Sequence, residues 1–204
     1  IAPEIAQGRR ALVIGGGYIG LEAAAVAAKR GVNVTMIEAG ERILQRVACS
    51  QTSDYFRDLH RSHGVDIREG VGLQGLQGSN GRVSSATLSD GTSLDIDFVI
   101  AGIGIVPNAE LARDAGLDCE NGIKVDARCT TSDPAIMAIG DCACFPCNGA
   151  LLRLESVGNA IDQGQAAAAI VMGSDQLYLA KPWFWSDQYD IKLQIAGLSS
   201  GFDT

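Results

Sequence analysis

The sequence contains no apolar run that approaches the ~20 residues a membrane-spanning helix needs. Its first stretch, IAPEIAQGRR, also lacks the charged segment followed by an apolar segment that is typical of a secretory signal peptide. Basic residues are outnumbered, since 16 lysines and arginines stand against 24 aspartates and glutamates and the net charge is −8. These absences predict a cytoplasmic protein that neither crosses a membrane nor binds nucleic acid.

Proline is scarce, with 5 residues in 204, whereas glycine is common, with 25. Apolar residues make up 47 % of the chain, which is enough for the core of one large domain or two small ones. The sequence has no internal repeats and no low-complexity tracts. The composition is that of an ordinary soluble globular protein.

Strand-like and helix-like segments alternate along the chain. Strands are expected over 11–14, 32–38, 65–76, 81–88, 92–104, 122–126, 135–141 and in the tail from 178, and helices over 18–30, 53–64, 109–116 and 155–172. The strands between 65 and 104 form a β-meander, with a tight turn at Ser89-Asp90-Gly91. This order predicts an α/β fold with a Rossmann-like domain into which the meander is inserted.

The stretch ALVIGGGYIGLEAAA, residues 11–25, carries the spacing Gly15-x-Gly17-x-x-Gly20 between a strand and a helix. Gly15 permits the tight turn, Gly17 lets the backbone approach a pyrophosphate, and Gly20 allows close packing of helix on strand. The turn, including Tyr18 and Ile19, therefore predicts a dinucleotide site at the helix N-terminus. The alternative is a glycine-rich turn that binds no ligand.

Glu38 ends the second strand about twenty residues after the turn, where an acid accepts hydrogen bonds from the adenosine ribose hydroxyls. A carboxylate there repels a 2′-phosphate, so the sequence favours NAD(H) over NADP(H). Arg42 and Arg46 follow shortly afterwards and could weaken that preference by contacting the cofactor. The alternative for both arginines is a solvated basic edge.

Two further acids are candidates for ligand contact. Glu22 lies near the start of the first helix. Its negative charge either stabilises the helix by interacting with the N-terminal end of the helix dipole, or lies close to the reactive nicotinamide. Asp141 ends the expected strand 135–141, a position where ligands bind in α/β folds.

The six cysteines are expected to be free thiols. Cys144 and Cys147 have the Cys-x-x-Cys spacing of a redox pair, which leaves a thiol–disulfide reductase as an alternative function. His60 and His63 lie three residues apart on a helix, but no Cys, Asp or Glu completes a metal site near them. A solvated helix face is the favoured interpretation, and no metal is expected.

Five blocks occur in order along the chain: VIGGGYIGLEAA, FVIAGIGIVPN, TSDPAIMAIGDCA, RLESVGNAIDQGQAAA and PWFWSDQYDIKLQIAG. Together they resemble the NADH-dependent, FAD-containing ferredoxin reductases of the putidaredoxin reductase and rhodocoxin reductase type, within the two-dinucleotide-binding, glutathione reductase-like flavoproteins. The resemblance implies an NADH-binding domain over 1–124, a returning segment of the FAD-binding domain over 125–175, and the start of a C-terminal interface domain over 176–204. It also implies that this sequence is a piece without the N-terminal FAD motif, so the piece alone is expected to lack turnover and not to retain FAD.

The resemblance further implies roles for single residues. Asp141 matches the acid that binds the ribityl hydroxyls of FAD. Val157 matches the residue whose backbone contacts the flavin ring, and Trp185 matches a tryptophan that packs beside the isoalloxazine. Without the resemblance, the alternation of Trp183 and Trp185 predicts that one of the two faces a core.

Three more positions match the nicotinamide end of the family's site. Gly104 and Glu155 match residues that line the nicotinamide pocket, and Glu22 matches a glutamate that pairs with a lysine at the flavin. The implied activity is transfer of electrons from NADH through FAD to a [2Fe–2S] ferredoxin that serves a P450 or a ring-hydroxylating oxygenase. An NADH-binding module without turnover is the remaining alternative for this chain.

Overall fold

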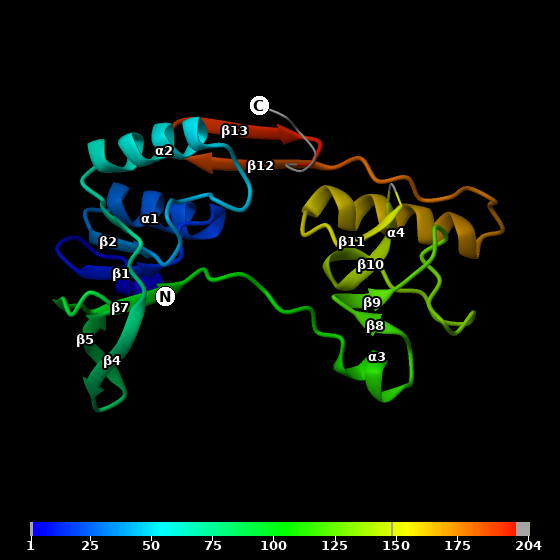
Figure 1. Cartoon of the computed structure of the whole chain (residues 1–204), viewed down its shortest axis with the longest axis horizontal. Coiled ribbons are helices and arrows are strands. Elements are labelled where there is room, and N and C mark those ends of the chain that lie inside the picture. Colours follow the sequence, from blue (N-terminus) through cyan, green and yellow to red (C-terminus); the bar gives the residue numbers. More distant parts are fainter. Residues whose placement is uncertain (1, 148, 199–204) are drawn as a thin grey trace. The chain divides into compact units, whose positions relative to one another are not determined.

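The computed structural model describes residues 2–147 and 149–198 (Figure 1). The chain forms two compact units, the first made of residues 2–104 and 186–193 and the second of residues 105–185 and 194–198. Each unit is described by itself below. The domain boundaries expected at residues 124 and 175 stay a prediction.

The first unit is an α/β domain. Its helices are η1 (Ala2–Glu4), α1 (Tyr18–Lys29) and α2 (Ser50–Ser62), and its strands are β1 (Arg10–Ile14), β2 (Asn33–Glu38), β3 (Asp66–Glu69), β4 (Leu73–Ser79), β5 (Arg82–Leu88), β6 (Ser93–Asp95) and β7 (Phe98–Ala101). Strands β3, β2, β1 and β7 lie in that order in one parallel sheet, with Leu12 opposite Thr35 on β2 and Val99 on β7. The predicted Rossmann-like arrangement is confirmed.

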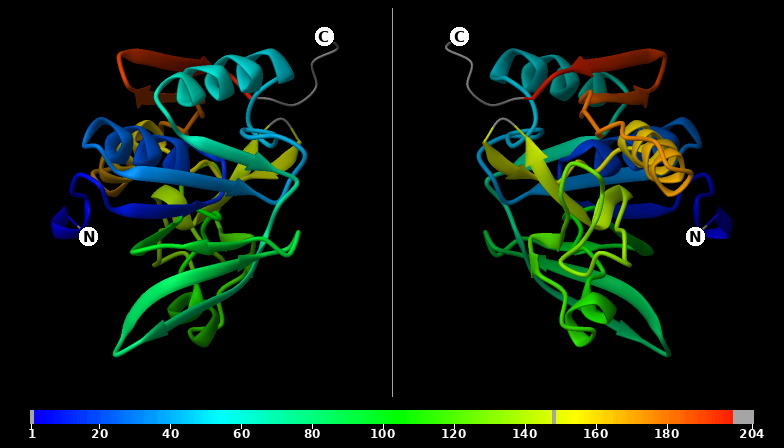
Figure 2. Two further views of the ribbon diagram at one scale, coloured as in Figure 1. Left: turned by 90° about the vertical axis from the view of Figure 1, so that its left-hand side faces the viewer. Right: turned by 90° about the vertical axis from the view of Figure 1, so that its right-hand side faces the viewer.

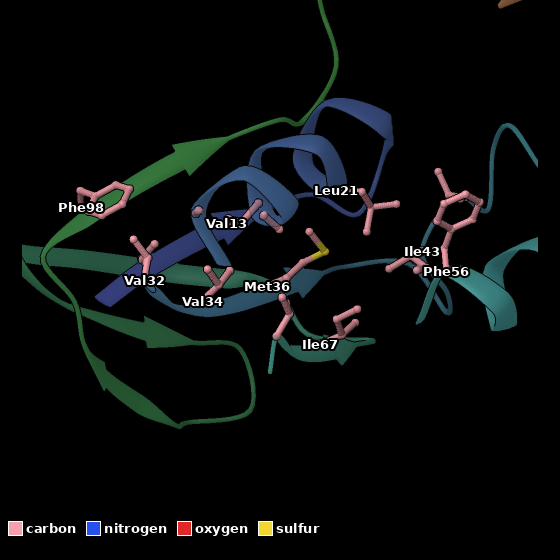
Figure 3. Packing of buried hydrophobic residues seen from close by; sticks show 14 residues of the cluster. Val13, Leu21, Val32, Val34, Met36, Ile43, Phe56, Ile67 and Phe98 are labelled. Carbon is pink, nitrogen blue, oxygen red and sulfur yellow. The ribbon is translucent and has the colours of Figure 1, made fainter. Parts of the chain in front are cut away.

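Side chains of β1 alternate between two buried layers, as the period of a strand requires. Ala11 and Val13 contribute to the core beneath α1, together with Leu21 of that helix and Met36 of β2 (Figure 3). Phe56 of α2 belongs to the same cluster. The continuous apolar run of β1 is thus explained by burial on both faces.

The opposite face of the sheet is covered by β4, β5 and β6, a three-stranded antiparallel sheet. Leu12 and Ile37 pack there against Ala86, Leu88 and Ile96. Figure 2 shows α1 and α2 on one side of the parallel sheet and the β4–β5 hairpin on the other. The inserted meander and its turn at Ser89-Asp90-Gly91 are therefore confirmed.

The second unit contains short elements around a smaller core. They are α3 (Glu110–Asp114), β8 (Cys119–Glu120), β9 (Gly122–Lys124), η2 (Gly140–Cys142), β10 (Ala143–Cys147), β11 (Ala150–Leu152) and α4 (Val157–Val171). The strands form a sheet in the order β11, β10, β9, β8. Its core includes Val125, Phe145 and Tyr178, with the last two rings edge to face at 5.3 Å between centroids.

The hairpin of β12 (Trp183–Gln188) and β13 (Ile191–Ala196) turns at Tyr189 and Asp190, and Tyr189 has a φ of 59°. Its residues 186–193 belong to the first unit, where Ile191 and Leu193 pack against the core. Within residues 2–147 and 149–198, no helix has both the length and the apolar character needed to cross a membrane.

Three expected strands differ from the structure. The segment 65–76 is broken into β3 and β4 at Gly70, whose φ of 70° interrupts the extended backbone, and 92–104 is divided between β6 of the meander and β7 of the parallel sheet. The strand expected over 135–141 is wrong, because this segment makes only an isolated bridge between Met137 and Thr130. Its apolar residues pack as an irregular loop, and the strand begins only at Ala143.

Candidate dinucleotide-binding site

The carboxyl ends of three parallel strands meet at the glycine turn of the first unit. The turn follows β1, the segment Gly102–Gly104 follows β7, and Glu38 ends β2. Because β1 lies between β2 and β7, this edge is the point where the strand order reverses, and ligands of open α/β sheets bind in the crevice there.

The three glycines of the turn have different surroundings. Gly15 has a φ of 98°, and a Cβ there would lie 2.4 Å from the Gly102 carbonyl oxygen. A Cβ on Gly20 would lie 2.0 Å from the Gly15 carbonyl oxygen, which closes the contact between α1 and the end of β1. No atom of the described residues lies within 4 Å of a Cβ built on Gly17. Packing therefore requires Gly15 and Gly20, whereas Gly17 faces open space that a phosphate can enter.

The N-terminus of α1 opens at the same place. Its N-cap residue is Gly17, and no side chain caps it. Backbone N–H groups and the helix dipole therefore favour an anion at this end. Ile19, 64 % exposed, lies on the open side, whereas burial raises the pKa of Tyr18 to about 12 and keeps its ring neutral.

Glu38 is held by backbone N–H groups of two loops, one after β1 and one after β2. One carboxylate oxygen accepts the Gly16 N–H at 2.7 Å and the other accepts the Gly40 N–H at 2.7 Å. A carboxylate oxygen can accept two hydrogen bonds, so both oxygens keep capacity for ribose hydroxyl donors. The strand end predicted from the sequence thus presents a fixed acid.

The two arginines after β2 have separate surroundings. The Arg42 guanidinium donates to the Ala48 carbonyl at 2.9 Å and to the Ser53 hydroxyl, so it stabilises the segment that leads into α2. Arg46 is exposed, and its Nη2 would lie 3.5 Å from a Cβ built on Gly104. Arg42 is therefore occupied by the fold, while Arg46 extends over the loop that follows β7.

The carboxylate of Glu22 accepts a hydrogen bond of 2.6 Å from the hydroxyl of Ser186 on β12. Glu22 lies beyond the first turn of α1, which contains no acidic residue, so the explanation by a helix N-terminus is wrong. A tertiary contact holds this side chain instead.

In the second unit, Asp141 and Glu155 are joined through Arg153. The Arg153 guanidinium donates to the backbone carbonyl of Asp141 at 3.0 Å and pairs with Glu155 at 2.7 Å. Its side chain is only 8 % exposed, and its Nε donates to Asn121 at 3.3 Å. Asp141 lies in η2 before β10 rather than at the end of a strand, and Arg153 fixes its backbone there.

The N-terminal part of α4 lies against η2. Gly140 has a φ of 76°, and a Cβ on it would lie 3.6 Å from the Ala160 Cβ of α4. Gln163 accepts the Gly140 N–H at 2.6 Å with its Oε1, which leaves its buried Nε2 without a partner in the described structure. Val157, at the first position of α4, is exposed. Asp141 and Val157 are thus brought to one end of the second unit.

The two tryptophans of β12 are stacked, with ring centroids 5.0 Å apart and planes inclined by 27°. Trp183 is 44 % and Trp185 37 % exposed. The expectation that one of them faces a core is wrong, because residues two apart on a strand point to the same face. Their shared face leaves both rings accessible.

The comparisons with known proteins agree on one family. A model described as "Pyridine nucleotide-disulphide oxidoreductase" matches residues 2–164, and one described as "Reductase C-terminal" matches residues 183–204. The chain belongs to the pyridine nucleotide-disulphide oxidoreductase family. This membership confirms the fold class expected from the glycine turn and the five sequence blocks.

Three relatives of this family are similar over nearly the whole chain. Putidaredoxin reductase of Pseudomonas putida is 46 % identical over 100 % of this chain and 49 % of its own length. Rhodocoxin reductase of Rhodococcus erythropolis is 47 % identical over 95 % of this chain and 46 % of its own length. The reductase in a solved covalent putidaredoxin reductase–putidaredoxin complex has a TM-score of 0.95, with 99 % of this chain and 49 % of that chain covered. The chain spans about half the length of the curated relatives it matches.

Cys144 and Cys147, the candidate redox pair of this family member, lie on the extended strand β10. Three residues along a strand span about 10 Å, whereas the two Cα atoms of a disulfide lie within about 7 Å. Cys144 is buried, which raises the pKa of its thiol and disfavours the thiolate. The geometry therefore opposes a disulfide between these two residues.

Several residues around the site were not identified from the sequence. Arg153 and Gln163 fix η2, and Ser186 holds Glu22. All three lie in the blocks RLESVGNAIDQGQAAA and PWFWSDQYDIKLQIAG, but the sequence predicts no role for them, because it does not show which polar residues are buried. His60 was expected on a solvated helix face, but its side chain is fully buried and forms a hydrogen bond with Gln188.

Proposed function

We propose that this chain supplies the NADH-binding part and a segment of the FAD-binding part of an NADH-dependent ferredoxin reductase. The observation that carries the proposal is the crevice of the first unit, where Gly17 leaves space at a helix N-terminus and Glu38 presents a fixed carboxylate. The similarity to putidaredoxin reductase and rhodocoxin reductase supports the reaction class.

The residues of the first unit have separate tasks in this proposal. The backbone of Gly15, Gly17, Tyr18, Ile19 and Gly20 receives the pyrophosphate at the start of α1. The described contacts leave both oxygens of Glu38 able to accept from the adenosine ribose hydroxyls, and its charge repels a 2′-phosphate.

The other end of the nucleotide lies along the loop after β7. Arg46, which extends over Gly104, is suited to neutralise the pyrophosphate rather than to bind a 2′-phosphate beside Glu38. The nicotinamide is then assigned to Gly104 and Glu22 of the first unit. Specificity for NADH follows from Glu38, because Arg42 is already occupied by Ala48 and Ser53.

The second unit fits a flavin. The described contacts leave the Asp141 carboxylate exposed for the ribityl hydroxyls, Val157 offers backbone N–H at the start of α4, and Trp185 offers an accessible ring face. Among the described residues, the Nε2 of buried Gln163 has no hydrogen-bond partner, and it lies beside η2. A flavin held by these residues would supply acceptance of a hydride from NADH and release of single electrons. The residues of this chain bind and orient both groups, and the proposal requires no side-chain nucleophile.

The electron acceptor is proposed to be a [2Fe–2S] ferredoxin that serves a P450 or a ring-hydroxylating oxygenase. The solved relative in a complex with putidaredoxin supports this class of partner. A cytoplasmic location is proposed as well, because all six cysteines are free thiols, as expected in a reducing compartment.

Binding of nucleotides to the purified chain tests the proposal. In titration calorimetry, NADH is expected to bind at least tenfold more tightly than NADPH. Glu38→Gln should remove most of that difference, whereas the control Glu41→Gln, an equal charge change on an exposed neighbour, should retain it. Equal affinity for both nucleotides in the unaltered chain would contradict the assignment of NADH.

The electron-transfer part is tested by spectroscopy on the complete, flavin-loaded reductase that contains this chain, with a [2Fe–2S] ferredoxin added. Reduction of the ferredoxin by NADH supports the reductase. Nucleotide binding without ferredoxin reduction supports the alternative of a binding module without turnover.

A further inference from the structure

A buried polar network connects α1, α2 and the β12–β13 hairpin within the first unit. Its members are Tyr189, His60, Gln188, Ser186 and Glu22. The three middle residues, His60, Gln188 and Ser186, have 0 % exposure. Since an unsatisfied buried polar group costs roughly 1–3 kcal/mol, the network persists only because its members satisfy one another.

The distances along the network are those of ordinary hydrogen bonds. They are 3.2 Å from Tyr189 Oη to His60 Nδ1, 2.8 Å from His60 Nε2 to Gln188 Oε1, 3.0 Å from Gln188 Nε2 to Ser186 Oγ, and 2.6 Å from Ser186 Oγ to Glu22 Oε1. The network ends at the candidate nicotinamide-proximal acid and is separate from the Glu38 end of the crevice.

The charge of Glu22 fixes the direction of every bond in the network. An ionised carboxylate only accepts, so the Ser186 hydroxyl donates to it and must accept from Gln188. Gln188 then turns its Nε2 toward Ser186 and its Oε1 toward His60.

The last two bonds follow from this orientation. His60 has to donate from Nε2 to the amide oxygen of Gln188, and its Nδ1 therefore accepts the Tyr189 hydroxyl. A neutral imidazole with its proton on Nε2 satisfies both neighbours. The Nδ1–H form could still donate to the Tyr189 hydroxyl, but its unprotonated Nε2 would face the Gln188 oxygen without a hydrogen.

We propose that Ser186 is a positioning residue: its hydroxyl holds the Glu22 carboxylate, and the buried network that extends to Tyr189 keeps Ser186 in place. The orientation of an acid on α1 is thereby set by the C-terminal hairpin. Glu22's place near the nicotinamide rests on the proposed function, but the coupling between Ser186 and His60 does not.

The groups around His60 favour its neutral form. Burial lowers the pKa of His60, the hydrogen bond to Gln188 opposes this in part, and the charge of His63 lowers it further. His63 stacks on Tyr189 with ring centroids 3.7 Å apart. Lys29 of α1 donates to the Tyr189 carbonyl at 2.7 Å and brings a second positive charge near the ring. Burial and the charge of His63 therefore disfavour a cation at His60.

The tautomer of His60 tests the proposal without any cofactor. The sequence has only 2 histidines, so ¹H–¹⁵N NMR of the imidazole nitrogens resolves both, and His63→Gln assigns them. The unaltered chain should show His60 as the Nε2–H tautomer. Ser186→Ala and Glu22→Gln should each admit a substantial fraction of the Nδ1–H tautomer, because Gln188 can then invert.

Two variants serve as controls. Ser186→Thr keeps the hydroxyl and should restore the Nε2–H tautomer. Asp187→Asn removes a carboxylate from the opposite face of β12 and should leave the His60 spectrum unchanged. An unchanged His60 tautomer in folded Glu22→Gln, or in folded Ser186→Ala, would overturn the proposal.

NADH affinity separates this proposal from the proposed function. A change of His60 tautomer together with a several-fold weaker NADH affinity in Ser186→Ala, restored by Ser186→Thr, supports both. A change of tautomer with unaltered NADH affinity supports the positioning of Glu22 and refutes its place at the nicotinamide.

Discussion

Substitution of two glycines of one turn by alanine should separate folding from ligand binding. In Gly20→Ala the new Cβ would lie 2.0 Å from the Gly15 carbonyl oxygen, about 1 Å inside the closest distance that real Cβ atoms adopt. The neighbour is backbone at the end of β1, so α1 has to move as a unit. Overpacking of this kind typically costs about 1–3 kcal/mol.

Gly17→Ala should have the opposite profile. Its φ of −78° suits alanine, and nothing lies within 4 Å of the added Cβ. Replacing glycine by alanine at an N-cap costs a few tenths of a kcal/mol to ~1 kcal/mol. The methyl group, however, occupies the space through which a pyrophosphate reaches the backbone, so NADH affinity should fall about tenfold or more, a loss of about 1.4 kcal/mol.

Urea unfolding and calorimetric titration with NADH measure the two effects separately. In urea, the free energy of unfolding of Gly20→Ala should be clearly lower than that of the unaltered chain. In thermal unfolding, each kcal/mol lost would lower the midpoint temperature by roughly 2–4 °C for a chain of this size. Gly17→Ala should keep nearly normal stability and lose affinity. If Gly17→Ala bound NADH normally, the turn would not be the pyrophosphate site.

Further predictions concern Glu69, the acid that ends β3, and the cysteines. Burial by itself would raise the pKa of Glu69, but hydrogen bonds from Arg57 and from the Ile43 N–H outweigh it and lower that pKa. The ionised Glu69 therefore stabilises the fold at pH values above its unfolded pKa of 4.5, and this stabilisation is lost as the pH falls through its lower folded pKa. Between about pH 6 and pH 3, the thermal unfolding midpoint should therefore decline less steeply in Glu69→Gln than in the unaltered chain. Thiol titration of the native chain should modify exposed Cys49 first, because hydrogen bonds from Thr52 lower the pKa of its thiol, whereas buried Cys129 and Cys144 should react only on unfolding, because burial raises theirs. The double variant Cys144→Ser with Cys147→Ser should bind NADH as the unaltered chain does; loss of binding would restore a role for this pair.

Local sequence signals predicted the fold of the first unit. The run ALVI, the spacing Gly15-x-Gly17-x-x-Gly20 and the acid Glu38 each depend on neighbours close in the chain, and the structure has the strand, turn and helix where these signals predict them. The meander could be predicted for the same reason, since its turns carry glycine at positive φ, as at Gly81 and Gly91.

The positions that failed depend on packing between distant segments. An apolar run such as AIMAIGD reads as a strand, but only the second unit's core decides that it folds as a loop with a single bridge at Met137. The alternation at Trp183 and Trp185 indicated a strand correctly, yet which face is covered depends on the neighbouring elements.

The sequence by itself thus determined the family, through five blocks along the chain. It also determined the glycine turn and the position of Glu38, the acid predicted to favour NADH, because both depend on residues that lie close together in the chain. Only the tertiary structure revealed what holds Glu22, since its partner Ser186 is separated from it by 164 residues. Hydrogen bonds between distant segments follow no local period, and a buried serine, glutamine or histidine looks in the sequence like any surface residue.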